Sequence, residues 1–347
     1  MKKVTNKDKF INYLKKHNKL SCYLVVLIIG TFFSLWLLKP GLLNGHDMTY
    51  HISRIKGIKD SIMIGDFRAL IHSGLYGYGY ANGLFYGNLM FYIPALFALK
   101  GINLINAYKI YLLICTMGSA LTMYWCMNGI TKNSKIGLIA SFLYSACSYK
   151  MCDFIVRGAA GEMGAFVFVP LIMLGFYKIV YDDYKKWWIF SIGFVGLIQC
   201  HLISTILMFI LSVVMILVNY ERFLREKQRI FYLLLSGIVG LSIGAHFIFP
   251  LLQGIMKNQM VINLNSFPTW DYAVPFEKLF LGFPYWGWDK SSFLPAGIGI
   301  IFIVISLFRF KIKVNKNDIL MKFCDLSIIM AYSTLFCATD LFPWKEL

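Results

Sequence analysis

Nine apolar runs, each between 14 and 23 residues long, dominate this sequence. A helix needs about 20 predominantly apolar residues to cross the hydrocarbon core of a bilayer. The stretch 187–219 has 33 residues, too many for one span and slightly few for two, so we expect two spans joined by a tight turn near Gln199-Cys200-His201. The sequence therefore predicts an all-α integral membrane protein with about nine transmembrane helices. The expected spans are 21–38, 104–126, 136–150, 163–181, 187–200, 201–219, 230–250, 294–310 and 323–341.

The composition excludes an ordinary soluble domain. Hydrophobic residues make up 58% of the chain, charged residues only 15%, and the mean hydropathy is +0.64. So few charged groups cannot cover the surface of a soluble domain of this size. The net charge of +17 would suggest nucleic acid in a soluble protein. In a membrane protein the positive charge instead reflects where the lysines lie relative to the bilayer. The expected partners are therefore membrane lipids, and nucleic acid is not expected to bind.

The basic residues also predict the orientation of the chain. With the N-terminus in the cytoplasm and one crossing per run, 21 of the 34 Lys and Arg residues fall in the short inner segments. Basic residues are retained on the cytoplasmic side of membranes. We therefore expect a basic cytoplasmic N-terminus over 1–20, with 127–135, 182–186 and 220–229 on the same side.

Two long segments, 39–103 and 251–293, would then face outward. Both are rich in Tyr, Trp, Gly and Pro rather than in charge. The stretch 86–100 is short and contains Pro94, which predicts an amphipathic helix lying in the outer interface rather than another span. Loops held on a rigid bundle carry function more often than the bundle does, so both outer segments are candidates for chemistry.

The first outer segment contains a candidate site. Read as a helix capped by Asn44, it places Asp47, His51 and Arg54 on one face at i, i+4 and i+7. The opposite face carries an apolar stripe of Met48, Ile52, Ile55 and Ile62. One interpretation is an interfacial amphipathic helix with solvated charges. The other is that Asp47 faces a catalytic cavity as a base or metal ligand, with His51 or Arg54 on a phosphate.

A second group of ionisable residues lies between the third and fourth expected spans. Asp153, Arg157 and Glu162 would lie near or inside the outer leaflet, where charged groups usually face a polar cavity or each other. A purely structural ion pair of Arg157 with Asp153 or Glu162 is the simpler interpretation. Glu162 would begin a helix, where its negative charge is stabilised.

His201 would lie at the outer turn, on the same side as Asp47 and Glu162, although a lone histidine is more often a packing residue. His246 lies inside an apolar run and is a weaker candidate. Trp270, Tyr285, Trp286 and Trp288 could form a platform for stacking a sugar or an interfacial belt. The sequence contains no Walker loop, dinucleotide fingerprint, His-Glu-x-x-His motif or zinc-ligand spacing.

Several of these segments together resemble a known group of proteins. They are Gly45-His46-Asp47 with His51 and Arg54, Gly77-Tyr-Gly-Tyr80 with Phe85-Tyr86, Arg157-Gly-Ala-Ala-Gly-Glu162 with Phe168-Val-Pro-Leu171, and Cys200-His-Leu-Ile-Ser204. The pattern, which covers roughly residues 20–255, is similar to bacterial YfhO-like membrane proteins and to the family labelled 6-pyruvoyl-tetrahydropterin synthase-related. Both resemble the GT-C class of membrane glycosyltransferases.

The resemblance implies a GT-C-like transmembrane module over 21–250 and a multi-pass protein of the bacterial cytoplasmic membrane. It also implies transfer of a sugar from a polyprenyl-phosphate-linked donor to a cell-envelope glycan or lipid acceptor on the outer face. Asp47 maps to the acidic residue that this class carries in its first outer loop, and Asp153 or Glu162 to acidic residues of the second. These would be catalytic residues or ligands of a divalent cation such as Mg or Mn.

On this interpretation Asp47 and Glu162 are the catalytic residues. His51, Arg54, Asp153, Arg157 and His201 would bind substrate, with an arginine on the lipid phosphate. Members of the class usually continue past the point where this chain ends, so the C-terminal spans over 294–347 suggest a short or truncated member. The alternative is a non-catalytic membrane protein with the same fold, either a transporter of lipid-linked sugars or an assembly partner.

Overall fold

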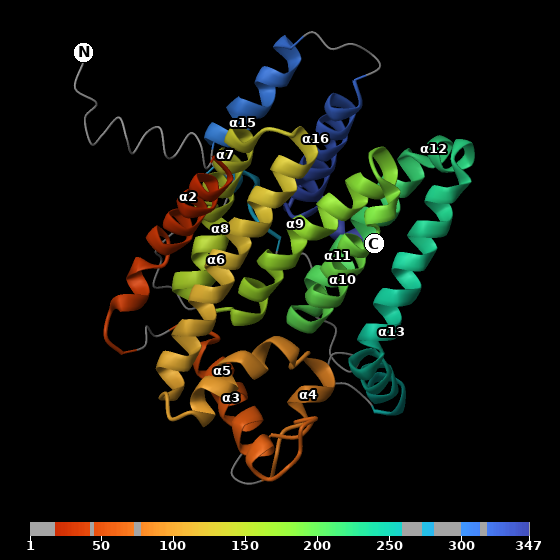
Figure 1. Ribbon diagram of the computed structural model, residues 1–347. Helices are drawn as coiled ribbons and strands as arrows, with labels where there is room; N and C mark the ends of the chain where they lie inside the picture. Colours follow the sequence, from red (N-terminus) through yellow and green to blue (C-terminus); the bar gives the residue numbers. More distant parts are fainter. Residues whose placement is uncertain are drawn as a thin grey trace, which may run out of the picture.

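The protein is almost entirely helical (Figure 1), and no strand occurs in the part of the chain that its computed structural model describes. That part comprises residues 18–41, 45–72, 78–258, 273–280, 300–312 and 318–346. Its principal helices are α2 (Asn18–Phe32), α3 (Met48–Met63), α4 (Asn82–Phe85), α5 (Tyr92–Leu99), α6 (Leu104–Thr131), α7 (Ser134–Ser145), α8 (Ser148–Cys152), α9 (Ala160–Tyr181), α10 (Trp188–Cys200), α11 (Leu202–Val218), α12 (Tyr220–Arg225), α13 (Lys227–Lys257), α15 (Ile300–Leu307) and α16 (Ile319–Cys337).

Four of these helices, α6, α9, α13 and α16, are long and apolar enough to cross a membrane. The described chain is thus that of an all-helical protein with several apolar helices of membrane-spanning character. The other expected runs form shorter helices. For example, α7 has 12 residues and at 1.5 Å per residue is roughly 18 Å long, less than the roughly 30 Å of a hydrocarbon core. Nine crossings therefore remain a prediction.

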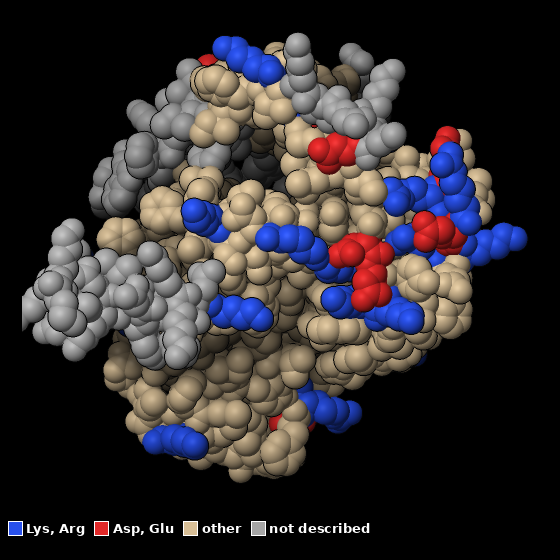
Figure 2. Space-filling view, turned by 45° about the horizontal axis from the view of Figure 1, so that its top comes forward, with Lys and Arg blue, Asp and Glu red and all other residues tan. Residues whose placement is uncertain are grey.

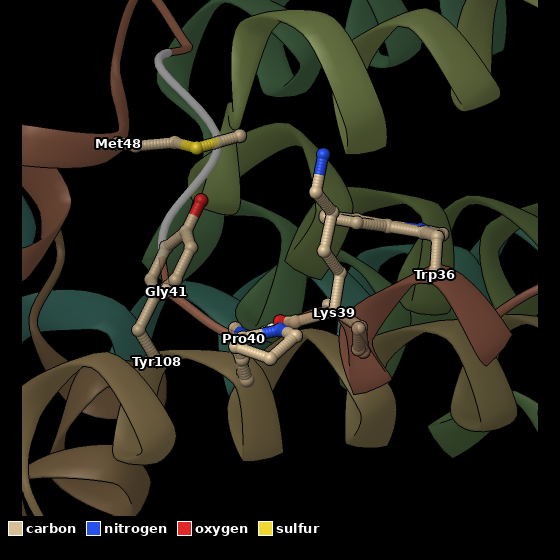
Figure 3. A pocket seen from close by; sticks show the side chains of 8 residues that line it. Trp36, Lys39, Pro40, Gly41, Met48 and Tyr108 are labelled. Carbon is tan, nitrogen blue, oxygen red and sulfur yellow. Dashed lines mark hydrogen bonds between the residues drawn. The ribbon is translucent and has the colours of Figure 1, made fainter.

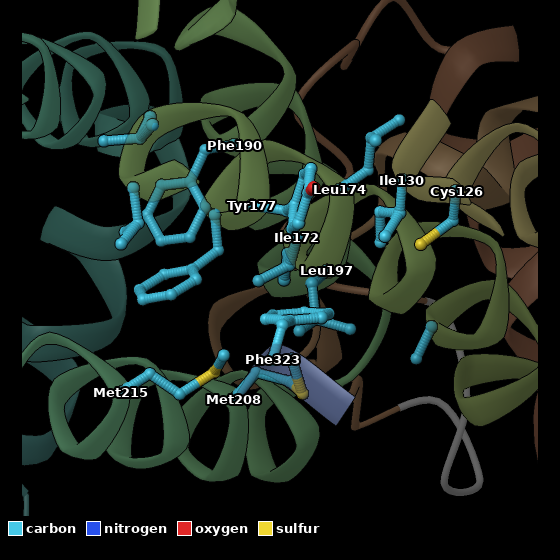
Figure 4. Close-up of a cluster of buried hydrophobic side chains, with 14 of the residues drawn as sticks. Cys126, Ile130, Ile172, Leu174, Tyr177, Phe190, Leu197, Met208, Met215 and Phe323 are labelled. Atoms are coloured by element: carbon cyan, nitrogen blue, oxygen red, sulfur yellow. The ribbon is translucent and has the colours of Figure 1, made fainter. Parts of the chain in front are cut away.

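Helix α9 occupies the centre of the bundle, where it packs against α6 and α10. Its most apolar stretch is largely buried, whereas only a small share of the corresponding stretches of α13 and α16 is buried. Glycines allow the close approach to α10, because a Cβ atom added to Gly175 would lie only 2.4 Å from the backbone nitrogen of Phe190. Figure 4 shows the buried apolar cluster that surrounds this helix, with Phe190, Leu197, Met208 and Phe323 converging from α10, α11 and α16.

The predicted turn between the fifth and sixth runs is confirmed: α10 ends at Cys200, α11 begins at Leu202, and His201 lies between them. The segment 86–100 forms a single 3-10 turn and the eight-residue helix α5, which is roughly 12 Å long and too short to cross a bilayer. Helix α5 packs against α3 and α6 at one end of the bundle (Figure 1). Its expected position in a membrane interface stays a prediction.

The interpretation of the first outer helix with solvated charges holds for Asp47, whose side chain is 41% exposed, but not for His51 and Arg54, which are buried. Helix α3 begins at Met48 with Asp47 as its N-cap residue, whereas Asn44, the expected cap, lies outside the described residues. The buried face includes His51 and Arg54 together with Met48 and Ile55. Both polar side chains pack on Phe91: the His51 ring stacks on it at 5.4 Å, and the Arg54 guanidinium lies 3.9 Å from its centroid. Periodicity assigns residues to one face of a helix, but it does not reveal an aromatic neighbour from another segment.

Basic residues gather at the end of the bundle opposite to α3 and α5, and we call this the basic end. It is formed by Lys132, Lys178, Asp182, Arg222 and Arg229. Lys132 and Lys178 both contact the Asp182 carboxylate, and Arg229 donates to the Asp182 carbonyl oxygen at 3.2 Å. Figure 2 views the molecule from this side and shows acidic groups lying among a larger number of basic ones. The predicted cytoplasmic segments 127–135, 182–186 and 220–229 therefore meet at one end of the bundle.

Candidate functional site

A single π-helical turn, Asp153–Arg157, brings two of the predicted site residues to the same side of the chain. Isolated π turns are rare and occur often at functional sites. The turn ends at Gly158, whose backbone φ of +66° favours glycine. A Cβ atom on Gly158 would also lie 2.1 Å from the Cγ atom of Met48. The Tyr108 hydroxyl donates to the Gly158 carbonyl oxygen at 2.8 Å and fixes this turn on α6.

Arg157 is the centre of a network of ion pairs that we call the Arg157 cluster: Asp47, Tyr149, Asp153, Arg157, Glu162 and His201. One guanidinium nitrogen of Arg157, Nη1, lies 2.7 Å from Asp153 Oδ1 and 2.9 Å from Glu162 Oε1. The other, Nη2, lies 3.7 Å from Asp47 Oδ2. The structure thus brings together carboxylates from three separate segments around one cation.

Glu162 lies in the first turn of α9, near the positive end of the helix dipole. The Tyr149 hydroxyl donates to Glu162 Oε2 at 2.6 Å. On the other side, His201 Nε2 lies 3.8 Å from Glu162 Oε1. The His201 Nδ1 atom accepts a hydrogen bond from the Ser204 backbone N–H, so the proton of a neutral His201 ring is on Nε2 and faces Glu162. The carboxylate of Glu162 is thereby held from three sides.

Asp47 is the most accessible carboxylate of the cluster. Its side chain is 41% exposed, compared with 12% for Glu162 and none for Asp153. Its position is fixed through the backbone, because the Asp47 N–H donates to the Arg157 carbonyl oxygen at 2.8 Å. Asp47 is therefore the acidic group in the cluster that an incoming molecule can reach.

Asp153 is the acid that holds a proton most tightly. Burial, followed by the neighbouring Glu162 carboxylate, raises the pKa of Asp153 to about 9. Its buried Oδ2 atom has no hydrogen-bond partner in the described part of the chain, so no donor stabilises a negative charge on this atom. Burial alone would lower the pKa of Arg157, but Asp153 and Glu162 outweigh it and raise this pKa. Arg157 therefore stays positively charged, while the neighbouring Asp153 tends to retain its proton.

His51 and Arg54 lie next to this cluster but are not open to solvent. Burial lowers the pKa of both side chains, and neighbouring positive charges, Arg54 and Arg157 among them, lower that of His51 further. Arg54 donates to the Gly87 carbonyl oxygen at 3.0 Å, whereas its Nε and Nη1 atoms and the His51 Nδ1 atom find no partner in the described chain. A substrate phosphate could contact Arg54 only after α3 or the 3-10 turn over Leu89–Phe91 had moved.

A divalent cation does not fit the cluster as it stands. Asp47, Asp153 and Glu162 all contact Arg157, whose guanidinium occupies the position between them that a bound cation would need. Within the described ranges, no group of three or more His, Cys, Asp or Glu side chains is arranged to hold a metal ion. Metal binding by these three acids would require Arg157 to turn away.

The cavity next to the cluster is very small. Trp36, Lys39, Met48 and Tyr108 line a pocket of about 10 Å³, in which the Tyr108 hydroxyl points toward the Met48 side chain (Figure 3). Such a volume holds a single water molecule. Substrate would therefore have to approach Asp47 from the open surface rather than through this pocket.

Tyr149 and Gly158 were not among the predicted site residues. Tyr149 precedes Asp153 and Arg157 by four and eight positions, so helical spacing alone would have placed it on the same face. The predicted aromatic platform of Trp270, Tyr285, Trp286 and Trp288 lies outside the described residues. His246 lies within α13 and contacts Gln199 at 3.2 Å, away from the Arg157 cluster.

Comparisons of the chain with models of known protein families, with curated proteins and with solved structures found no match.

Proposed function

We propose that this protein is a membrane glycosyltransferase that moves a sugar from a polyprenyl-phosphate-linked donor to a cell-envelope acceptor. The observation that carries the proposal is the convergence of an exposed carboxylate, Asp47, with Arg157 and His201 at the end of the bundle opposite to the basic end. With basic residues retained in the cytoplasm, this end faces outward from a bacterial cytoplasmic membrane.

In the proposed reaction, Asp47 accepts the proton of an acceptor hydroxyl group. The hydroxyl oxygen forms a bond to C1 of the sugar as the bond between C1 and the phosphate oxygen breaks, and the electron pair of that bond leaves with the lipid phosphate. Arg157 and the Nε2–H of His201 provide donors for the charge that develops on the phosphate. Glu162, held by Tyr149, keeps His201 oriented with this proton toward the cluster.

One observation favours the alternative of a non-catalytic transporter or assembly partner. Arg157 already balances carboxylates on three sides, so it has little charge to spare for a phosphate. A proton retained by Asp153 offsets this in part, because it leaves two ionised acids instead of three. The enzyme hypothesis therefore depends on Asp47 acting as a base, whereas the alternative does not.

The deciding experiment replaces Asp47 with Asn, which keeps the shape of the side chain but removes its charge. Loss of a general base should lower transfer by about 10²–10⁴-fold. The measurement is envelope glycan analysis of a deletion strain complemented with wild type or Asp47→Asn at matched protein levels. Arg157→Ala should instead weaken donor binding.

Asp60→Asn is the matched control, because Asp60 lies on the same helix, α3, but its carboxylate forms an ion pair with Lys56 and is not a member of the Arg157 cluster. Exposed ion pairs of this kind contribute little to stability, so the control should complement fully. Full complementation by Asp47→Asn as well would leave the non-catalytic alternative as the better description.

A further inference from the structure

A second cavity lies far from the Arg157 cluster, where α9, α11 and α16 meet. Its volume is about 170 Å³, close to that of engineered apolar cavities that stay dry and bind benzene. The cavity can therefore hold a segment of a hydrocarbon chain. Ile172, Met173 and Phe176 line it from α9, Met208, Leu211, Ser212 and Met215 from α11, and Ser327, Met330, Ala331 and Thr334 from α16.

The hydroxyl groups of the lining offer no free hydrogen-bond donor to an occupant. Each hydroxyl that it contains is bonded within its own helix: Ser212 donates to the Met208 carbonyl oxygen at 2.7 Å, Ser327 to that of Phe323 at 2.8 Å, and Thr334 to that of Met330 at 3.0 Å. The remaining surface is aliphatic, aromatic or methionine. Methionine side chains adapt to irregular apolar shapes, so the cavity suits a flexible hydrocarbon rather than a polar ligand.

The two walls of the cavity differ in exposure. On the wall from α9 and α11, Ile172, Met208 and Met215 are buried (Figure 4). On the wall from α16, by contrast, Ala331 and Thr334 are exposed. The cavity therefore opens sideways through α16, in the direction from which a bilayer lipid would enter.

The position of the cavity along α9 indicates the leaflet that supplies the occupant. Its α9 wall centres about eight residues from Asp182 and twelve from Glu162, which at 1.5 Å per residue is roughly 12 Å from the basic end and roughly 18 Å from the Arg157 cluster. Half the thickness of a hydrocarbon core is roughly 15 Å. An acyl chain from a lipid headgroup at the basic end would thus reach the cavity without crossing the bilayer.

The basic end provides a matching charge for such a headgroup. The guanidinium of Arg222 lies over the Tyr181 ring at 5.1 Å, and Tyr181 in turn packs on Phe323 of α16. The buried Nε atom of Arg222 has no hydrogen-bond partner in the described part of the chain. A phosphate beside Arg222 would therefore lie on the same side of the molecule as the path down to the cavity.

We propose that this cavity is a binding site for one acyl chain of an anionic phospholipid of the leaflet at the basic end, with its phosphate beside Arg222. The site is independent of the proposed glycosyl transfer. A polyprenyl-phosphate donor used at the Arg157 cluster would bring its phosphate to the opposite end of the bundle.

The test uses the full chain in nanodiscs of phosphatidylcholine that contain a small fraction of phosphatidylglycerol with a diazirine in its acyl chain. After photolysis, peptide mass spectrometry locates the label. We expect label on Met208 and Met215, which bulk lipid cannot reach because both are buried. Arg222→Gln should reduce this label several-fold, and an equal fraction of diazirine-labelled phosphatidylcholine should give several-fold less.

Cavity-filling variants provide the second measurement. Ala331→Leu, at an exposed position of the lining, and Ser212→Leu, from the opposite wall, should each remove most of the label from Met208 and Met215. The matched control is Ser333→Leu, because Ser333 is exposed and its position two residues along α16 turns it by about 200° from Ala331. The control should leave the label unchanged, and thermal denaturation identifies a variant that fails to fold.

The proposal is overturned if Ala331→Leu folds and leaves the label on Met208 and Met215 intact. Equal labelling by the two phospholipids would also overturn it, because the headgroup would then play no part. A third arm uses polyprenyl phosphate with a diazirine in its chain: label from this probe on the same two residues would assign the cavity to the donor lipid instead.

Discussion

The Asp153 carboxyl group is the one acid of the Arg157 cluster with no exposed surface. Its protonation therefore differs between the folded and the unfolded protein. Folding raises its pKa from the ordinary 3.8 to about 9. The folded protein therefore binds this proton more tightly than the unfolded chain does. The stabilisation is complete below the lower value and is lost as the pH rises toward the higher one.

Asp153→Asn should remove this contribution to the pH dependence of stability. Asn keeps an oxygen that can accept the hydrogen bond from Arg157, but it binds no proton over this pH range. We expect the melting temperature of the variant to rise relative to wild type as the pH increases across this interval. Thermal denaturation of both proteins in the same detergent at a series of pH values measures the difference. Parallel profiles for the two proteins would show that Asp153 is ionised throughout.

The pairing around Arg157 could be predicted at the level of residues, but the surroundings of Arg54 could not. Asp153 and Arg157 are four positions apart, so any helical turn brings them together, and the confirmed turn at His201 places that side chain near Glu162. The sequence places Arg54 on the polar face of the predicted helix, where an interfacial helix would expose it to solvent. Its burial depends on Phe91, which is 37 positions away along the chain. Local periodicity contains no information on such a contact.

Among the helices, α9 is closely packed against α10, and glycine replaces a larger side chain at this contact. A Cβ atom at Gly175 would lie 2.4 Å from the backbone nitrogen and 2.6 Å from the Cα atom of Phe190. Backbone atoms cannot turn aside as a flexible side chain can. Gly175→Ala should therefore push α10 away and lower the free energy of unfolding by about 1–3 kcal/mol, the usual cost of overpacking.

Gly237→Ala is the matched control for this prediction, since nothing lies within 4 Å of its added Cβ atom on α13. It should be neutral or stabilising by up to about 1 kcal/mol, because alanine is the better helix former. Melting temperatures of the two variants and wild type provide the comparison. Equal stability of Gly175→Ala and Gly237→Ala would mean that α9 and α10 are not packed at this distance.

The apolar runs predicted helix positions well where a run is continuous, as for α6 and α9. The runs predicted helix positions less well where one run contains the end of an α-helix and the start of another helical segment. The run 136–150 was expected as one span, but α7 ends at Ser145, and α8 and the π-helical turn follow. Lys150, within that run, is buried and bonds to the Ser119 hydroxyl of α6. Such a break depends on tertiary contacts, which hydropathy along the chain does not report.

At the scale of the whole molecule, two polar ends are separated by the length of α9. Glu162 and Asp182 are 20 residues apart, which is roughly 30 Å along a helix and close to the thickness of a hydrocarbon core. The Arg157 cluster lies at one end, and Lys and Arg outnumber Asp and Glu on the view of the other end in Figure 2. The two ends therefore fit the two surfaces of a membrane, and the distribution of positive charge predicts that the basic end is cytoplasmic.

Cysteine labelling tests this orientation in a background from which the eight native cysteines have been removed. Tyr78, which is 93% exposed, lies in the segment that joins α3 to α4, and Lys227 begins α13 at the basic end. An impermeant maleimide applied to intact cells should label Tyr78→Cys and should not label Lys227→Cys. Both should react after the cells are lysed, which controls for accessibility. Strong labelling of Lys227→Cys before lysis would place the basic end outside, and the Arg157 cluster would then face the cytoplasm, where an outward-facing transferase could not use it.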